Sequence, residues 1–315
     1  MPADRNAGSP SADFPEAAAH PAPPRRALLL VNRHAGNGEC DLTEVTAALR
    51  SGGMDVEAHV FPKKHAMPDV IRERAGDVHC IVIGGGDGTL NAAAEAVVDS
   101  GRPLGILPLG TANDLARTLG IPADPVSAAR VILNGTTRTL DLGVANGHLF
   151  WNVASVGFAT DLADALSTGM KKRWGVLAYA LATVRRLAGL RRFSADLAYD
   201  GRVERVRTLQ VSVGNGRHHG GGLTVAWEAE PDDGLLHVYS LEPRHWLELL
   251  AVLPALRRGK QAEWRGVRSF ACTELEVRTG KPLAVNTDGG IATATPVRFQ
   301  VRPGAVAVYV PSPSS

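Results

Sequence analysis

The segment from Ile81 to Leu90, IVIGGGDGTL, constrains the fold more than any other stretch of the chain. Apolar and β-branched residues before a glycine cluster predict a buried strand that ends abruptly. The residues that follow, to about Val98, have a helical pattern. A strand, a glycine turn and a helix start together place several backbone N–H groups at the positive end of the helix dipole. This order predicts a phosphate-binding site; the alternative is an ordinary tight turn.

The glycine loop differs from the two common phosphate-binding motifs. A Walker loop needs a lysine and a hydroxyl residue after its last glycine, and the Rossmann pattern needs a glycine where Thr89 or Asn91 stands. Three glycines followed by Asp87, Gly88 and Thr89 exceed what a tight turn requires. We expect Thr89 to cap the helix or to contact a phosphate oxygen. Asp87 is the one acid among the expected phosphates.

The composition is that of an ordinary globular protein. The chain has 315 residues, of which 44% are hydrophobic and 21% charged, and this length suggests about two domains. A net charge of +2 argues against a dedicated nucleic-acid binder. The three cysteines, Cys40, Cys80 and Cys272, form no C-x-x-C pair. We therefore expect a reducing, cytoplasmic compartment and no zinc site.

Strand and helix patterns alternate through the first half. Residues 1–26 are rich in proline, alanine and serine and predict a disordered tail, without the apolar core of a signal peptide. Strand patterns then occur at about 27–32, 56–61, 81–84 and 103–107, with helical patterns between them. This alternation predicts an α/β fold with an open parallel sheet.

Three glycine-bearing loops follow strands of this sheet. They comprise residues 32–38, 84–89 and 108–114. Ligands of such sheets bind beyond the carboxyl ends of the strands, so the three loops predict a nucleotide site. The last loop, in the segment LPLGTANDLAR, offers Thr111, Asn113 and Asp114 at a helix start. One of these residues would suffice as an N-cap, and three favour a site as well.

Strands dominate the chain after about Leu140. Asn146-Gly147 is a strong hairpin signal, and few crossover helices follow, so we expect an antiparallel second domain. Further strands are predicted at 194–200, 203–214, 235–241, 267–279, 296–302 and 305–310.

Two helices interrupt the second half, at 171–190 and about 244–258. The first is too short in its apolar run to span a bilayer and carries clusters of lysine and arginine. It predicts either peripheral contact with an anionic membrane surface or a core-facing helix with solvated basic ends.

Two acidic turns lie between strands of this half. Asp232 and Asp233 belong to the first, and Asp288 to the second, Asn286-Thr287-Asp288-Gly289-Gly290. Paired aspartates can hold a hard cation together with carbonyl oxygens, but each segment is also typical of an ordinary turn.

Taken together, these motifs resemble those of the bacterial diacylglycerol kinase-like lipid kinases, relatives of sphingosine and ceramide kinases. The resemblance runs from about Arg26 to Pro311. GGGDGT resembles the family's nucleotide loop, and LPLGTANDLAR its second signature, which NAD kinases lack. RTLDLG, WNVASVGF, GNGRHHGGG and PDDGLL follow in the family's order.

The resemblance implies an NAD kinase/diacylglycerol kinase-like fold of two domains. Residues 27–140, to which about 304–315 can return, would form the α/β ATP-binding domain, and 141–303 a β-sandwich-like acceptor domain. It implies ATP as phosphoryl donor, Mg²⁺ bridging its phosphates, and a hydroxyl of a membrane lipid as acceptor. The acceptor lipid and the oligomeric state, a homodimer included, stay open.

The resemblance also implies roles for individual residues. The first ATP loop would contain Asn32 and Gly36; the second would contain Gly85, Gly86, Asp87, Gly88 and Thr89, with Thr111 close by. Asp114 is similar to an acid of the network around the acceptor. Asp233, with the carbonyls of Glu230 and Leu235, matches a structural Mg²⁺ site.

One position departs from the family. The usual Asp-Gly-Glu turn, whose Glu is the proposed general base, here reads Asp288-Gly289-Gly290. A general base contributes about 10²–10⁴-fold, and Asp87 first or Asp288 second could take its place. The departure supports one alternative to an active lipid kinase, a catalytically silent nucleotide or lipid binder. The GGGDGT loop taken alone would also fit a kinase for a soluble acceptor such as NAD.

Overall fold

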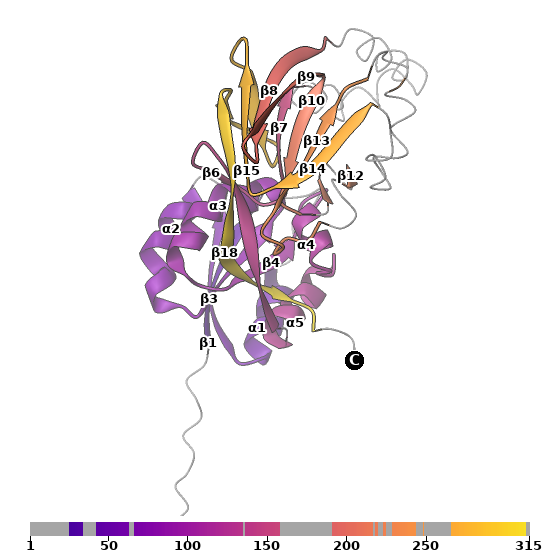
Figure 1. The fold of residues 1–315 in the computed structure, drawn as a ribbon. Coiled ribbons are helices and arrows are strands. Elements are labelled where there is room, and N and C mark those ends of the chain that lie inside the picture. The colour runs from indigo at the N-terminus through magenta and orange to yellow at the C-terminus, as the bar shows by residue number, and fades with distance from the viewer. Residues whose placement is uncertain are drawn as a thin grey trace, which may run out of the picture.

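The computed structural model of the chain describes residues 25–33, 42–62, 66–134, 136–157, 191–216, 218–219, 223–224, 229–243, 248 and 266–312. Helices gather in one half of the described molecule and most strands in the other (Figure 1). Most of the predicted tail, the first-loop residue Gly36 and the predicted helix at 171–190 lie outside these residues, as does all but Glu248 of the helix predicted at 244–258.

The first half contains the predicted parallel sheet. β1 pairs in parallel with β2 and β3, and β3 pairs in parallel with β4. β3 is buried along its whole length, as expected of a strand covered on both faces. The strands are β1 (Arg25–Asn32), β2 (Met54–Phe61), β3 (Cys80–Gly85) and β4 (Leu104–Pro108).

Helices form two packed pairs in this half: α1 contacts α5, and α2 contacts α3. The helices are α1 (Leu42–Ser51), α2 (Met67–Arg74), α3 (Asp87–Ser100), α4 (Asp114–Thr118) and α5 (Pro125–Asn134), with a 3-10 helix at Ala75–Asp77. None of the helices in the described ranges is long and apolar enough to cross a bilayer.

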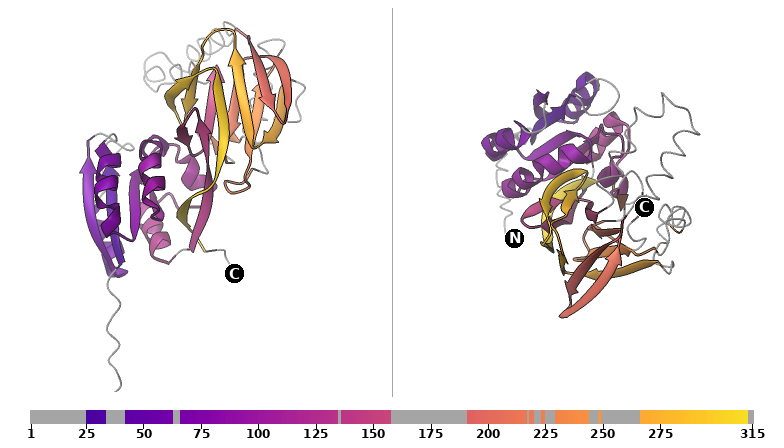
Figure 2. Two further views of the ribbon diagram at one scale, coloured as in Figure 1. Left: turned by 60° about the vertical axis from the view of Figure 1, so that its left-hand side comes forward. Right: turned by 90° about the horizontal axis from the view of Figure 1, so that it is seen from above.

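The second half is a sandwich of two sheets. One has six strands in the order β14-β13-β10-β7-β16-β17, and each neighbouring pair is antiparallel. The other continues the sheet of the first half in the order β2-β1-β3-β4-β18-β15-β8-β9. Phe150, Val211, Val277 and Phe299 come from both sheets and share one buried core. The α/β fold with a β-sandwich-like second domain is therefore confirmed (Figure 2).

The strands of this half are β5 (Thr136–Ala145), β6 (His148–Phe150), β7 (Val153–Gly157), β8 (Phe193–Tyr199), β9 (Arg202–Thr208), β10 (Gln210–Gly214), β13 (Leu236–Leu241), β14 (Val267–Cys272), β15 (Glu274–Thr279), β16 (Ala284–Thr287), β17 (Gly290–Ala294) and β18 (Val297–Val310). A short pair, β11 (His218–His219) and β12 (Leu223–Thr224), lies apart from both sheets.

Two predicted strands are each divided between the sheets. The segment 203–214 is β9 in the long sheet and β10 in the six-stranded sheet, with Leu209 between them. The segment 267–279 likewise is β14 and β15, divided at Thr273. The apolar pattern continues through each corner because both arms bury side chains in the same core. The prediction of single strands there was wrong.

β18 joins the two halves. It pairs in parallel with β4 at Val308↔Leu104 and antiparallel with β5 and β15 (Figure 1). The two strands predicted at 296–302 and 305–310 are this one strand, with a register shift between Arg302 and Val306.

Candidate active site

The glycine loop and the LPLGT loop touch through their backbones. β3 ends at Gly85, Gly86 is extended (φ −97°, ψ −177°), and α3 begins at Asp87. A Cβ atom on Gly86 would lie 3.0 Å from the Gly110 Cα, and one on Gly110 would lie 2.4 Å from the Gly86 Cα. Only glycine fits both positions, because no Cβ approaches backbone that closely. The two predicted loops therefore lie side by side.

Asp87 caps the helix of the neighbouring loop. Its Oδ2 accepts a hydrogen bond from the Asp114 backbone N–H (3.1 Å), and its Oδ1 from that of Leu115 (3.1 Å). These amides belong to the first turn of α4, where an anion is favourable. The cap of α4 is therefore supplied from a different loop.

Asn113 has a different role from the predicted N-cap. It precedes α4 with φ +50° and makes no capping side-chain hydrogen bond. Its side-chain amide instead closes the turn at Gly110. The Oδ1 atom accepts a hydrogen bond from the Gly110 backbone N–H (2.9 Å), and Nδ2 donates to the Gly110 carbonyl (2.8 Å). Thr111 is exposed in the same turn, and Asp114 is buried at the start of α4.

Thr89 lies beneath the glycine loop. It is 4% exposed, and its Oγ1 accepts a hydrogen bond from Asn32 Nδ2 (3.0 Å). A Cβ atom on Gly85 would lie 2.5 Å from the Thr89 Cβ. α3 has no side-chain cap, so the capping role expected for Thr89 was wrong. The residue connects the glycine loop to the end of β1.

Asp288 brings a second carboxylate to this region from the other half. It occupies the β16–β17 turn with φ +46°. Its Oδ2 accepts a hydrogen bond from the Trp151 backbone N–H (2.7 Å), and its Oδ1 accepts from Asn152 (3.0 Å) and Val153 (3.1 Å). Burial of the carboxylate, with a smaller contribution from the charge of Asp87, raises the pKa of Asp288 to about 6 against the effect of these three hydrogen bonds.

Two asparagines that were not predicted as site residues, Asn91 and Asn152, join the halves at the site. Asn152 Nδ2 donates to Asp87 Oδ1 (3.4 Å), while its backbone N–H binds Asp288. Asn91 Nδ2 donates to the Thr287 carbonyl (3.4 Å). Asn152 lies within WNVASVGF, which was the available signal for it.

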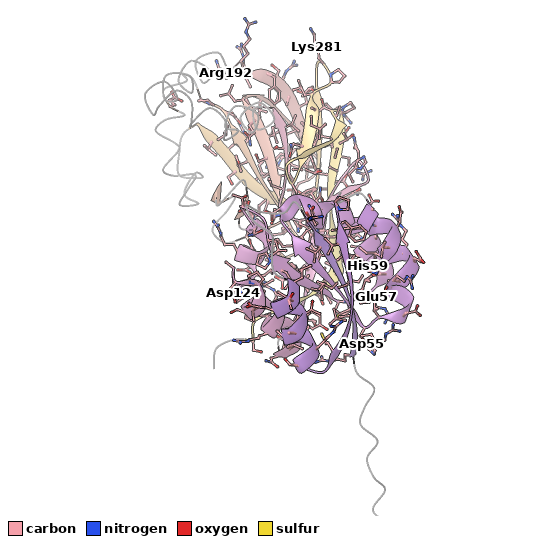
Figure 3. The ribbon with its side chains drawn as sticks, turned by 180° about the vertical axis from the view of Figure 1, so that it is seen from behind. Asp55, Glu57, His59, Asp124, Arg192 and Lys281 are labelled. Carbon is pink, nitrogen blue, oxygen red and sulfur yellow. The ribbon has the colours of Figure 1, made fainter. Side chains whose placement is uncertain are left out.

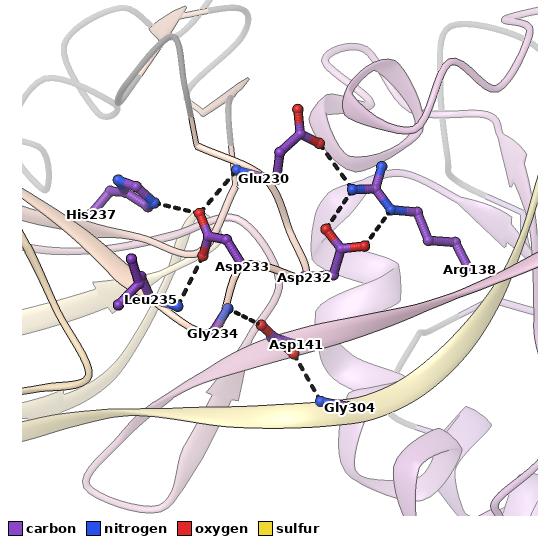
Figure 4. A network of polar contacts seen from close by, with 9 residues as sticks. All are labelled: Arg138, Asp141, Glu230, Asp232, Asp233, Gly234, Leu235, His237 and Gly304. Atoms are coloured by element: carbon purple, nitrogen blue, oxygen red, sulfur yellow. Dashed lines mark hydrogen bonds and ion pairs between the residues drawn. The ribbon is translucent and has the colours of Figure 1, made fainter.

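Hydrogen bonds to the Asp233 carboxylate hold the turn at Glu230–Leu235 (Figure 4). The Asp233 carboxylate accepts backbone hydrogen bonds from Glu230 (3.2 Å) and Leu235 (2.9 Å), and His237 Nε2 lies 2.7 Å from its Oδ2. No group of three or more acidic, histidine or cysteine side chains suited to a metal occurs in the described part of the chain. The Asp233 carboxylate is therefore already engaged by these groups, and the Mg²⁺ site with the carbonyls of Glu230 and Leu235 stays a prediction.

The same turn is anchored to β5 and β18. Arg138 of β5 binds Asp232 (Nε–Oδ2 2.7 Å) and Glu230 (2.9 Å), and the hydrogen bond from Arg138 lowers the pKa of Asp232. The buried Asp141 accepts backbone hydrogen bonds from Gly234 and Gly304, both at 2.8 Å (Figure 4). The PDDG segment is thus a structural anchor in this arrangement.

Both halves of the chain match known protein families. The diacylglycerol kinase catalytic domain matches residues 26–145, and the YegS C-terminal NAD kinase β-sandwich-like domain matches residues 152–310. A Pseudomonas aeruginosa protein named "Probable lipid kinase YegS-like" is 38% identical over 91% of this chain and 94% of its own. A Pseudomonas putida protein of the same name is 34% identical over 92% and 97%.

Solved structures show the same fold. A Bacillus anthracis protein assigned as a diacylglycerol kinase superposes with a TM-score of 0.80 at 25% identity, covering 94% of this chain and 98% of that one. A Bacillus anthracis diacylglycerol kinase gives 0.72 at 23% identity, covering 92% and 98%. With both domains matched in order and relatives aligned over nine-tenths of its length, the chain belongs to the family of diacylglycerol kinase-like, YegS-like bacterial lipid kinases.

Proposed function

We propose that this protein transfers the γ-phosphoryl group of ATP to a hydroxyl of a membrane lipid. The observation that carries the proposal is the meeting of Asp87, in the loop before α3, with Asp288, from the other half, across Asn152. Two carboxylates beside a glycine loop and a helix N-terminus supply a phosphate cradle and a proton acceptor in one place.

The phosphates of ATP would lie on the glycine loop. Gly85, Gly86 and Gly88 form this loop, and the amides at the start of α3 face an anion favourably. Asn32 and Thr111 flank the loop. Gly36 would complete the site from a segment outside the described residues.

Mg²⁺ would come with the nucleotide. The oxygen-only acids at the site suit a hard cation, but Asp87 and Asp288 each already accept three N–H hydrogen bonds. We therefore expect the phosphates and water to supply most ligands, with at most one carboxylate. The ion would neutralise charge on the transferred group.

Asp288 is the better candidate for the proton acceptor. A pKa of about 6 leaves its carboxylate ionised at neutral pH yet basic enough to take a proton from a lipid hydroxyl. Asp87, the first choice from the sequence, instead holds α4 against the glycine loop. Asp114 would support this arrangement through its backbone N–H and lie close to the acceptor.

Peripheral membrane contact is part of the proposal. Ser194 pairs with Arg207 and Ala195 with Thr279, so the start of β8 lies beside the ends of β9 and β15. Cations gather at this pole, far from Asp55 (Figure 3). They are Arg191, Arg192, Arg207 and Lys281. Within the described ranges no acid forms an ion pair with these four, and such a patch attracts anionic lipid. Salt-sensitive flotation with anionic vesicles, weakened in Arg207→Glu/Lys281→Glu, tests it.

A catalytically silent nucleotide or lipid binder is the second candidate, and Gly290 favours it. Such a protein would bind ATP without turnover. A kinase for a soluble acceptor such as NAD is the third, and strict dependence of transfer on lipid vesicles would exclude it.

The deciding experiment is transfer of γ-³²P from ATP-Mg²⁺ to a total bacterial lipid extract. We expect a labelled lipid with the native chain, and a loss of about 10²-fold or more with Asp87→Asn, because the glycine loop and α4 separate. Asp55→Asn is the matched control, because Asp55 is an exposed aspartate that pairs with Arg26 at 3.5 Å (Figure 3). ATP binding without any labelled lipid would favour the binder.

A further inference from the structure

A cavity of about 240 Å³ lies on the outer side of the Asp288 turn, between α3, β6 and the β16–β17 hairpin. Both halves of the molecule line it. Its walls are formed by Asn91, Ala92, Glu95, His148, Leu149, Thr287, Gly290, Ile291 and Ala292. The cavity therefore flanks the acidic centre on the side away from the Trp151–Val153 backbone.

The cavity is open where the family usually carries a glutamate. A Cβ atom on Gly290 would meet nothing nearer than the Thr287 carbonyl oxygen, at 3.8 Å. Thr287 pairs with Gly290 across the hairpin, so a side chain at position 290 would leave the backbone on the same face as Thr287, which lines the cavity. In this chain that space is available to a ligand.

The wall chemistry selects the kind of ligand. Glu95 is the charged carboxylate of the wall, and His148 and Asn91 add hydrogen-bonding groups, while none of the described residues that line the cavity is a lysine or arginine. Asp288, in the adjoining turn, adds a further acid. Such a pocket binds hydroxyl groups and disfavours an anionic phosphodiester, since an unpaired like charge is costly.

The rim of the cavity is apolar. Ile291, which also lines the cavity, is 71% exposed, more than Val60 and Val203, the other exposed large hydrophobic residues in the described part of the chain. A polar pocket with an exposed isoleucine at its mouth fits a molecule with a polar head and an apolar chain.

We propose that this cavity receives the head group of the acceptor lipid and that Glu95 makes the protein select uncharged, hydroxylated head groups over anionic ones. The inference rests on the proposed lipid kinase function and adds the acceptor class to it. Glu95 acts as a specificity residue, His148 and Asn91 bind the head, and Ile291 contacts the first part of the chain.

The test compares two acceptors in mixed micelles of an uncharged detergent, diacylglycerol and phosphatidylglycerol, at equal mole fraction. The native protein should label diacylglycerol preferentially. Glu95→Lys should shift the labelling ratio by about tenfold or more toward phosphatidylglycerol, because one full charge is reversed beside the head group. Glu95→Gln should shift it less, in the same direction.

Glu44→Lys is the matched control, because it makes the same change in net charge at an exposed position of α1, which is not part of the cavity wall. An equal shift in this variant would mean that net charge attracts the micelle, and would overturn the inference. So would an unchanged ratio in Glu95→Lys, or preferential labelling of phosphatidylglycerol by the native protein.

A binding measurement separates this inference from the kinase itself. Monomeric dihexanoylglycerol should slow amide hydrogen exchange in β17 of the native protein, and dihexanoyl phosphatidylglycerol should do so only in Glu95→Lys. Protection with this selectivity but no transfer to either lipid would overturn the kinase and leave the cavity assignment intact. Transfer without protection, or protection that does not depend on Glu95, would overturn the cavity assignment and leave the kinase intact.

Discussion

Two glycine-bearing turns meet at the candidate site, and they use glycine differently. In the loop before α3 and its neighbour, added Cβ atoms would lie 2.5 Å from Thr89 (from Gly85) and 2.4 Å from Gly86 (from Gly110). In the β16–β17 turn, a Cβ on Gly290 would meet only one atom within 4 Å, at 3.8 Å. The first turn is crowded and the second is open.

The difference separates what the fold requires from what the chemistry requires. The crowded glycines are required by close contact between neighbouring segments, so a larger residue there disturbs the architecture of the candidate site. At position 290, no close contact with a described residue requires glycine. The missing glutamate is therefore a change in the chemistry or the ligand of the site, and the fold tolerates either residue.

The largest effect is expected from filling the crowded turn. Gly110→Ala would place a methyl group 2.4 Å from the Gly86 Cα and 2.7 Å from Asn113 Oδ1. We expect a loss of about 1–3 kcal/mol in the free energy of unfolding and a loss of ATP binding of more than about tenfold. Urea unfolding and calorimetric titration with ATP measure both. Gly76→Ala, with no atom within 4 Å of the new Cβ, is the control; equal behaviour of the two variants would contradict the crowding argument.

The next effect tests whether the open turn carries the chemistry. Asp288→Asn should lower transfer by about 10²-fold or more, because an amide cannot take the proton. In the native protein the rate should rise with pH through an apparent pKa near 6, as the carboxylate ionises, and this limb should be missing in the variant. A limb that persists in Asp288→Asn would return the role of proton acceptor to Asp87.

The same carboxylate predicts a pH dependence of stability. Its folded pKa of about 6 exceeds the ordinary value of 3.8, so the folded state binds the proton more tightly than the unfolded state. The stabilising contribution is full below about pH 4 and is lost as pH rises through about 6. Relative to Asp288→Asn, the native free energy of unfolding should fall by up to about 3 kcal/mol between pH 4 and 7. A relative rise instead would show that the three backbone hydrogen bonds outweigh burial.

The smallest effect is expected at Gly290. Gly290→Ala should change the free energy of unfolding by less than about 0.5 kcal/mol, because the new methyl group meets no close neighbour. Gly290→Glu should be tolerated similarly, and it should raise lipid phosphorylation if the native turn lacks a general base. A strongly destabilised Gly290→Ala protein would remove the distinction between the two turns.

The sequence predicted the order of strands and loops because buried parallel strands and glycine loops leave local patterns. It also led to Asp87, Thr89 and Asp288. It could not predict that Asp87 caps α4, since that contact joins Asp87 to Asp114 and Leu115 of another loop. The sequence pattern left the cap open among Thr111, Asn113 and Asp114, and the Asn113 side chain instead binds within its own turn.

Asn152 and Asn91 were missed for a related reason. Each acts across the two halves, through contacts that depend on how the six-stranded sheet lies on α3. The corners at Leu209 and Thr273 were also invisible, because an alternating strand keeps its pattern when it passes from one sheet to the other in a shared core.

The position of β18 has a consequence for synthesis of the chain. One side of β4 pairs with β3, and the other with β18, which the ribosome makes about 190 residues after β4. During translation the nascent first half must therefore wait with an unpaired edge strand, which is a template for aggregation. Chaperone demand should consequently continue until β18 emerges, and truncation of the chain before Val297 should be as damaging as an earlier truncation.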